Sequence, residues 1–86
     1  MHNNMSAPFI RAELFLNDGT IQHLSSRKSR RIFHFIQTAN EQEVDYFFIR
    51  VTYSLSNLDK AIFQNEGEYK SKSQAIETLK QFLEKP

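Results

Sequence analysis

The longest apolar stretch of the chain runs from Val44 to Leu55, VDYFFIRVTYSL, and it contains neither Gly nor Pro. The two-residue period of a β-strand divides this stretch between two faces. One face is a continuous apolar row of Phe47, Ile49, Val51, Tyr53 and Leu55. The other face mixes apolar and polar residues, namely Val44, Tyr46, Phe48, Arg50, Thr52 and Ser54. The pattern predicts a central strand with one buried face and one partly available face.

A second strand is predicted from Phe9 to Leu16, with the inward row Ile10, Ala12, Leu14 and Leu16. The Asp18-Gly19 pair that follows is typical of a two-residue type I′ hairpin. That turn would place Leu16 opposite Ile21, and Glu13 opposite Leu24. The returning strand would end in the polar, basic segment 25–31.

The segment from Arg31 to Ala39 is predicted as a further strand, although both of its alternating rows are apolar. The polar turn 40–43 would bring it back antiparallel to the strand 44–55. Beyond a turn at 56–59, Lys60 to Gln64 is expected to form a short fifth strand or an irregular edge. A second Gly-bearing turn is expected at residues 65–68.

The C-terminal segment has the pattern of an amphipathic helix. Ser71 followed by Gln74 resembles a capping box, and Ser73 is an equally good N-cap. Ile76, Leu79, Phe82 and Leu83 then form one apolar stripe at spacings of three and four. The sequence therefore predicts a two-layer α+β domain, residues 9–86. It would consist of an antiparallel four- or five-stranded meander with one C-terminal helix on one face, preceded by a flexible lead-in at residues 1–8.

Composition limits the function classes. The 86 residues suffice for one domain, and the absence of Cys removes disulfide scaffolds and thiol catalysis. No apolar run approaches the roughly 20 residues that span a bilayer, so no membrane association is expected. The N-terminus has no charged segment followed by an apolar one, which leaves a cytoplasmic location as the expectation.

Catalytic patterns are weak. The two glycines, Gly19 and Gly67, are isolated in predicted turns, so no phosphate-binding loop is expected. His23 and His34 would approach each other on adjacent strands, but a third metal ligand is missing. Ser25 lies near His23, but no acid is placed to orient the imidazole. We expect neither an enzyme nor a protein that binds a metal, a cofactor or a small-molecule substrate.

The surplus of aromatic residues is the stronger signal. Eight Phe and three Tyr exceed what one face of a small sheet buries, and one helix covers only one face. The uncovered face is expected to collect Phe9, Phe15, Leu24, Tyr46, Phe48 and one of the two apolar rows of the segment 31–39. Exposed apolar patches of this kind usually mark an interface. The leading hypothesis is a non-enzymatic interaction module that binds itself, as a homodimer, or another protein through Phe15, Tyr46, Phe48 and Arg50. The competing interpretation is that the chain's own loops cover this face.

The alternative function is single-stranded nucleic-acid binding. It would use the local cluster of cations and the neighbouring rings, Arg27, Lys28, Arg30, Arg31, Phe33 and Phe35. A strand meander followed by one helix is similar in outline to the single-stranded-DNA-binding folds of the Whirly and PUR type, which implies the same partner. The net charge of +1 gives phosphate binding little support. The plain interpretation of the cluster is a basic loop that keeps a sheet edge soluble.

Overall fold

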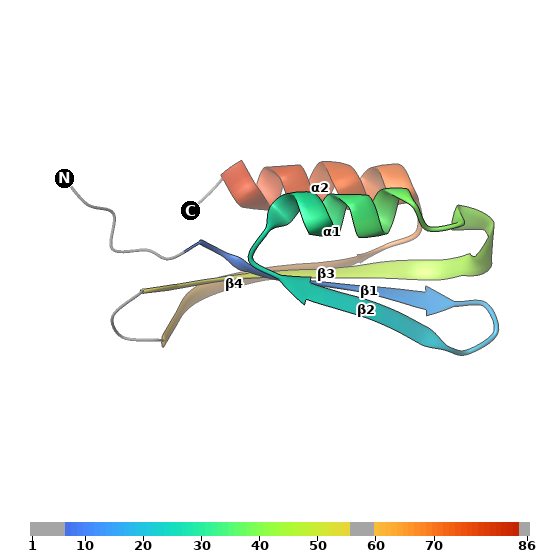
Figure 1. Ribbon diagram of the computed structural model, residues 1–86, viewed down its shortest axis with the longest axis horizontal. Helices are drawn as coiled ribbons and strands as arrows, with labels where there is room; N and C mark the ends of the chain where they lie inside the picture. The colour runs from blue at the N-terminus through green and yellow to red at the C-terminus, as the bar shows by residue number, and fades with distance from the viewer. Residues whose placement is uncertain (1–6, 56–59, 85–86) are drawn as a thin grey trace.

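The computed structural model describes the backbone of residues 7–55 and 60–84 and the side chains of residues 7–53 and 64–84 (Figure 1). Four strands and two α-helices alternate as β-β-α twice. Their bounds are β1 Phe9–Leu16, β2 Ile21–Ser26, α1 Ser29–Gln37, β3 Val44–Leu55, β4 Lys60–Tyr69 and α2 Lys72–Glu84, with a short 3-10 helix, η1, at Glu41–Glu43. The strands form one antiparallel sheet in the order β2-β1-β3-β4.

The predicted fold class is confirmed. The domain is α+β, with an antiparallel four-stranded sheet and a C-terminal helix packed on one face. The predicted strands 9–16 and 44–55 match β1 and β3 at both ends. The order is not that of a simple meander, because β3 pairs with β1 instead of following β2. Both helices lie on the same side of the sheet (Figure 1).

The core fills the space between the sheet and the two helices. The inward rows of β1 and β3 are buried as predicted for Ile10, Ala12, Leu14, Phe47, Ile49, Val51 and Tyr53, while the side chain of Leu55 lies outside the described residues. The helices contribute Ile32, Ile36, Ala75 and Leu79. Val44, predicted on the other face, is also buried, because an irregularity at Phe15/Leu16 shifts the pairing so that Leu16 opposes Val44.

The β1–β2 hairpin differs from the prediction by one residue. Gly19 N donates to Leu16 O, Leu16 N donates to Thr20 O, and Gly19 has φ of 90°. This is a three-residue loop whose last residue is left-handed, rather than a two-residue type I′ turn. Phe15 therefore faces Ile21, and Ala12 faces Leu24. Leu24, predicted on the uncovered face, instead packs against the core.

The prediction of a strand at 31–39 is wrong, because Ser29–Gln37 forms the helix α1. Ile32 and Ile36, one helical turn apart, are both fully buried. Phe33 and Phe35 pack against the same core from the flanks of the helix. A short apolar run with two apolar rows is compatible with the period of a helix and with that of a strand. The helix is favoured here because it buries the inner face of the sheet.

The prediction of a second Gly-bearing turn at residues 65–68 is also wrong. Residues 65–68 continue β4, and Gly67 pairs with Ile49 in mid-strand. A Cβ at Gly67 would clash with the phenol of Tyr69, so the missing side chain makes room for this ring. The predicted strand Lys60–Gln64 is the first half of β4. The predicted turn at 56–59 and residues 1–6 of the lead-in lie outside the described part of the chain.

The C-terminal helix α2 begins as predicted. Ser71 Oγ accepts a hydrogen bond from Gln74 N at 3.1 Å. Lys72 then joins the two helices: its Nζ donates to Gln37 O and Ala39 O at the end of α1, and its backbone N donates to Glu41 Oε2. Among the described residues, no helix has the length and apolar character needed to cross a membrane.

Candidate interaction surface on the sheet

The sheet face that points away from the helices, called the open face here, is formed by alternate residues of all four strands (Figure 1). The strand registers place on it Ile21, His23 and Ser25 of β2, Phe9, Arg11, Glu13 and Phe15 of β1, Tyr46, Phe48, Arg50 and Thr52 of β3, and Gln64, Glu66 and Glu68 of β4. No described helix or strand packs on this face. The expectation that it is not covered by a second layer therefore holds for the described part of the chain.

A stacked ring pair lies on the two central strands, at the end of the open face next to the β1–β2 hairpin. Phe15 and Tyr46 are direct cross-strand partners, and their rings lie 4.4 Å apart between centroids at an angle of 12°. The Lys70 ammonium lies 5.9 Å from the Tyr46 ring and 3.2 Å from Asp45 Oδ1. Stacking of this kind holds both rings flat against the strands.

Charged side chains fill the rows beside the rings. Arg50 lies 5.2 Å above the Phe48 ring, and its Nε is 3.0 Å from Glu66 Oε1. Arg11 Nε is 2.6 Å from Glu13 Oε2, and Arg11 Nη1 donates to Ser25 Oγ. Arg11 and Arg50 are cross-strand partners, so two like charges meet at the centre of the face, each beside a carboxylate. The open face thus carries both signs.

Two large apolar side chains are exposed among those that the structure describes, and both lie on the open face. Ile21 is 52% exposed and Phe9 is 43% exposed. The other rings are half-buried, because they stack on each other or lie under a guanidinium or ammonium group. The surface is therefore a mixed aromatic and charged layer, which is the composition enriched at interface centres.

All four residues predicted to bind a partner, Phe15, Tyr46, Phe48 and Arg50, lie together on the open face. Ile21 and His23 share this face but were missed, because the predicted hairpin register was shifted by one residue. Arg11 and Glu13 were missed although they alternate with the inward row of β1. Their alternation with Ile10, Ala12 and Leu14 was the signal that could have found them.

The predicted nucleic-acid residues are divided between two places. Arg27 follows β2, lies 5.5 Å from the Phe9 ring and donates to Ala7 O. Lys28, Arg30 and Arg31 lie at the start of α1, on the helical side of the sheet. Phe33 and Phe35 are partly buried and pack against the core. Of the predicted set, Arg30, Arg31 and Phe35 line one surface groove, while Arg27 lies apart from them beside Phe9.

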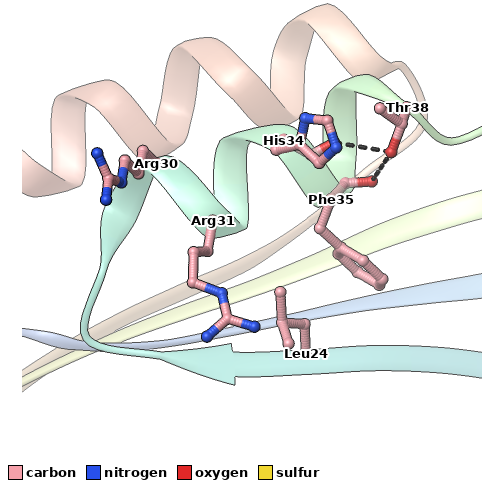
Figure 2. Close-up of a pocket in the computed structure, with 6 residues that line it drawn as sticks. All are labelled: Leu24, Arg30, Arg31, His34, Phe35 and Thr38. Atoms are coloured by element: carbon pink, nitrogen blue, oxygen red, sulfur yellow. Dashed lines mark hydrogen bonds between the residues drawn. The ribbon is translucent and has the colours of Figure 1, made fainter.

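A groove of about 500 Å³ lies between α1 and the edge strand β2. Figure 2 shows Arg31 and Phe35 pointing from α1 toward β2 beside Leu24, with Arg30 and His34 higher on the helix. Thr38 completes the lining, and its hydroxyl donates to His34 O at the end of α1. The groove thus has an apolar floor and a basic rim.

The two candidate metal ligands do not converge. His23 lies on the open face and His34 on α1 on the other side of the sheet, so the predicted approach of the two imidazoles is wrong. The described residues contain no group of three side chains that could hold a metal. Two pKa shifts have structural causes. Hydrogen bonds from the Thr20 hydroxyl and backbone N–H lower the pKa of Asp18, and burial raises the pKa of Tyr53.

Comparison of the chain with models of known protein families, with curated proteins and with solved structures finds no match in any of the three. The geometry of the chain itself is therefore what bears on its function.

Proposed function

We propose that the protein is a small non-enzymatic interaction module whose open face binds a second copy of the same chain. The observation that carries this proposal is the composition of the open face, which has a stacked ring pair at its hairpin end, Phe48 among charged side chains in its middle, and both exposed large apolar side chains of the described residues at its margins. Such side chains gain the most when water is excluded from them.

The charges favour a second copy over a strongly charged partner. The open face combines Arg11, Arg50 and His23 with Glu13, Glu66 and Glu68. A two-fold contact uses the same patch on both subunits, so the patch must be complementary to itself. A patch of one sign repels its copy, whereas a patch of both signs can place cations opposite carboxylates.

The energetic contributions are unequal. The exposed ion pairs each add about 0–1 kcal/mol, and they set the relative position of the subunits more than the affinity. The rings contribute more, because burial of apolar surface is worth about 25 cal/mol per Å². Tyr46 and Phe48 are therefore expected to be the residues whose loss weakens the dimer most.

The test is the molecular mass in solution as a function of concentration, measured by sedimentation equilibrium. The wild type is expected to reach twice the chain mass of 10.2 kDa. The double variant Tyr46→Ser, Phe48→Ser is expected to stay at the chain mass with unchanged far-UV circular dichroism. A wild type that stays at the chain mass at every concentration would contradict the proposal.

A matched pair of charge variants tests whether the dimer contact lies on the open face or elsewhere on the surface. Ile21→Glu adds a negative charge at an exposed position of the open face, and Gln81→Glu adds one at an exposed position of α2. Ile21→Glu should weaken the dimer roughly tenfold or more, because a buried unpaired charge is costly. Gln81→Glu should leave the association constant unchanged. Equal effects of both variants would place the contact elsewhere.

The alternative, single-stranded nucleic-acid binding, is supported by Lys28, Arg30 and Arg31 at the start of α1 and by Phe35, which lines a groove together with Arg30 and Arg31. Against it, the predicted stacking rings Phe33 and Phe35 are partly buried against the core. An oligonucleotide titration at two salt concentrations tests it, because phosphate contacts give a steep salt dependence. Absence of binding at low salt would exclude it.

A further inference from the structure

The groove between α1 and β2 is distinct from the open face, because it lies on the helical side of the sheet (Figure 2). Its lining combines the apolar side chains of Leu24 and Phe35 with the basic groups of Arg30, Arg31 and His34. One wall is a helix and the other is a strand. Grooves with these two walls are where several protein modules bind extended peptides.

The cations of the groove are unpaired. Within the described residues, the side chains of Arg30 and Arg31 make no ion pair or hydrogen bond. By contrast, Arg11 and Arg50 each lie against a carboxylate on the other side of the sheet. The α1 sequence SRRIFHFIQ contains no acidic residue that could neutralise the rim. The groove therefore has an uncompensated positive charge next to an apolar floor.

The strand wall offers backbone groups. β2 is an edge strand, paired only with β1. Leu16 N donates to Thr20 O, so the alternation of an antiparallel ladder directs the backbone of Gln22, Leu24 and Ser26 toward β1. The N–H and C=O groups of Ile21, His23 and Ser25 consequently point outward, beside the groove.

The β2 edge also lacks the features that usually protect an edge. Its sequence IQHLSS contains no Lys, Arg, Asp, Glu or Pro. The other edge strand, β4, carries Lys60, Glu66 and Glu68. An unprotected edge beside a lined groove is the arrangement used for strand addition.

We infer that the groove between α1 and β2 binds an acidic extended peptide of a partner protein, which adds to the sheet as a strand next to β2. A second copy that pairs its own β2 with this β2 does not fit as the occupant, because its α1 and β2 contain no carboxylate to neutralise Arg30 and Arg31. An acidic peptide supplies both the charge and the strand.

The lining sets the pattern of the peptide. Side chains two positions apart in a strand lie on the same face, about 7 Å from each other. One such side chain would lie over Leu24 and Phe35, and the next would reach Arg31. The peptide is therefore expected to carry an apolar residue and an acidic residue separated by one position.

The probe for the test is the fluorescently labelled, end-capped peptide Thr-Glu-Thr-Phe-Thr-Glu-Thr, which presents this pattern in both chain directions. Fluorescence anisotropy with the full chain is expected to show saturable binding. Replacing both Glu by Lys, or N-methylating the backbone amides along the peptide, is expected to weaken binding about tenfold or more, because these changes remove the charge pairing and, in either chain direction, the strand pairing respectively. Failure of the probe to bind, or binding that N-methylation leaves unchanged, would overturn the inference.

The matched protein variants are Arg31→Glu and Lys80→Glu. Both reverse one exposed cation on a helix, and Lys80 lies on α2 away from the groove. Arg31→Glu places a carboxylate in the first turn of α1, where it favours the helix, so folding is expected to be intact. It should weaken the probe about tenfold, whereas Lys80→Glu should change the affinity less than twofold. Equal losses would overturn the inference.

Two further measurements locate the binding site of the probe and distinguish a peptide site from a nucleic-acid site. Amide hydrogen exchange of Ile21, His23 and Ser25 should slow when the probe is bound, because their outward N–H groups become paired. A short oligothymidylate should not compete with the probe. If the oligonucleotide instead binds and Arg31→Glu abolishes its binding while the peptide does not bind, the groove is a nucleic-acid site and the inference is wrong.

Discussion

Single residues decide which side chains reach each face of the sheet. Gly19 ends the first hairpin loop with φ of 90°, and this extra loop residue shifts β2 by one position. The shift moves Leu24 to the core and places Ile21 and His23 on the open face. A shift of one residue in strand register exchanges the two faces of the strand. The third residue of the loop therefore decides which face each side chain of β2 occupies, as far as Ser26.

Asp18 stabilises this turn through its ionised form. Its Oδ1 accepts hydrogen bonds from Thr20 N at 2.9 Å and from Thr20 Oγ1 at 2.7 Å, which lowers the pKa of the carboxyl below its ordinary value. A lowered pKa means that the stabilisation is present above the unfolded-state pKa and is lost as the pH falls through the folded-state value. Asp18→Ala should therefore be less stable than the wild type at neutral pH, and this difference should shrink below about pH 4.

The measurement is urea denaturation of both proteins from neutral to acidic pH. Glu84→Ala, at an exposed position of α2, serves as a control that removes one carboxylate elsewhere. A difference between wild type and Asp18→Ala that stays constant across the acidic range would contradict the role of the ionised carboxylate.

Gly67 was predicted in a turn, yet it lies in mid-strand, and the Tyr69 ring occupies the space that a Cβ at Gly67 would fill. Gly67→Ala should destabilise the domain by about 1–3 kcal/mol, since the new Cβ displaces a ring that packs against the core. In a Tyr69→Ala background the same substitution should cost much less. A double-mutant cycle by urea denaturation measures this coupling, and additive losses would show that the ring is not the cause.

At the scale of elements, the sequence predicts β1, β3 and α2 well, because each carries one clear period. The inward row of β1 is apolar while its outward row is mixed, and the stripe of α2 follows a capping Ser71. The segment 29–37 carries no such information. Ile32 and Ile36 fit a helix, while Phe33 and Phe35 beside them also fit a strand, so only the need to cover the sheet selects the helix.

The joint between the two helices depends on Lys72. Its Nζ donates hydrogen bonds to two backbone carbonyls at the C-terminal end of α1, Gln37 O at 2.9 Å and Ala39 O at 2.6 Å. Lys72→Met should destabilise the domain by about 1–2 kcal/mol, because two carbonyl groups lose a charged donor. Lys80→Met, which removes an exposed cation of the same helix, should change stability by less than about 0.5 kcal/mol. Thermal and urea denaturation of the three proteins measure both values, and similar losses would contradict this role of Lys72.

At the scale of the whole molecule, the sequence predicts the open face for a simple reason. The strand Val44–Leu55 has two partly apolar faces, and the predicted layers provide cover for one. The helix α1, which the sequence does not reveal, lies on the same side of the sheet as the predicted helix α2. The open face therefore stays uncovered by either helix, as expected (Figure 1). The four residues selected for this face follow from the period of two, which the hairpin error does not affect in β1 and β3.

The groove between α1 and β2 could not be predicted, because both of its walls depend on elements that the sequence misplaces. Arg31 was assigned to a strand and Leu24 to the opposite face of the sheet. The local concentration of Arg27, Lys28, Arg30 and Arg31 was visible, but its neighbours were not. Charge clusters are read directly from a sequence, whereas a groove exists only once two elements are placed side by side.

The central claim, that two copies meet through the open face, is tested most directly by hydroxyl-radical labelling of side chains at low and high protein concentration. Phe15, Tyr46 and Phe48 should become protected as the concentration rises, while Phe33 and Phe35 on the helical side should be labelled to the same extent throughout. Labelling of Phe15, Tyr46 and Phe48 that does not change with concentration would contradict the account.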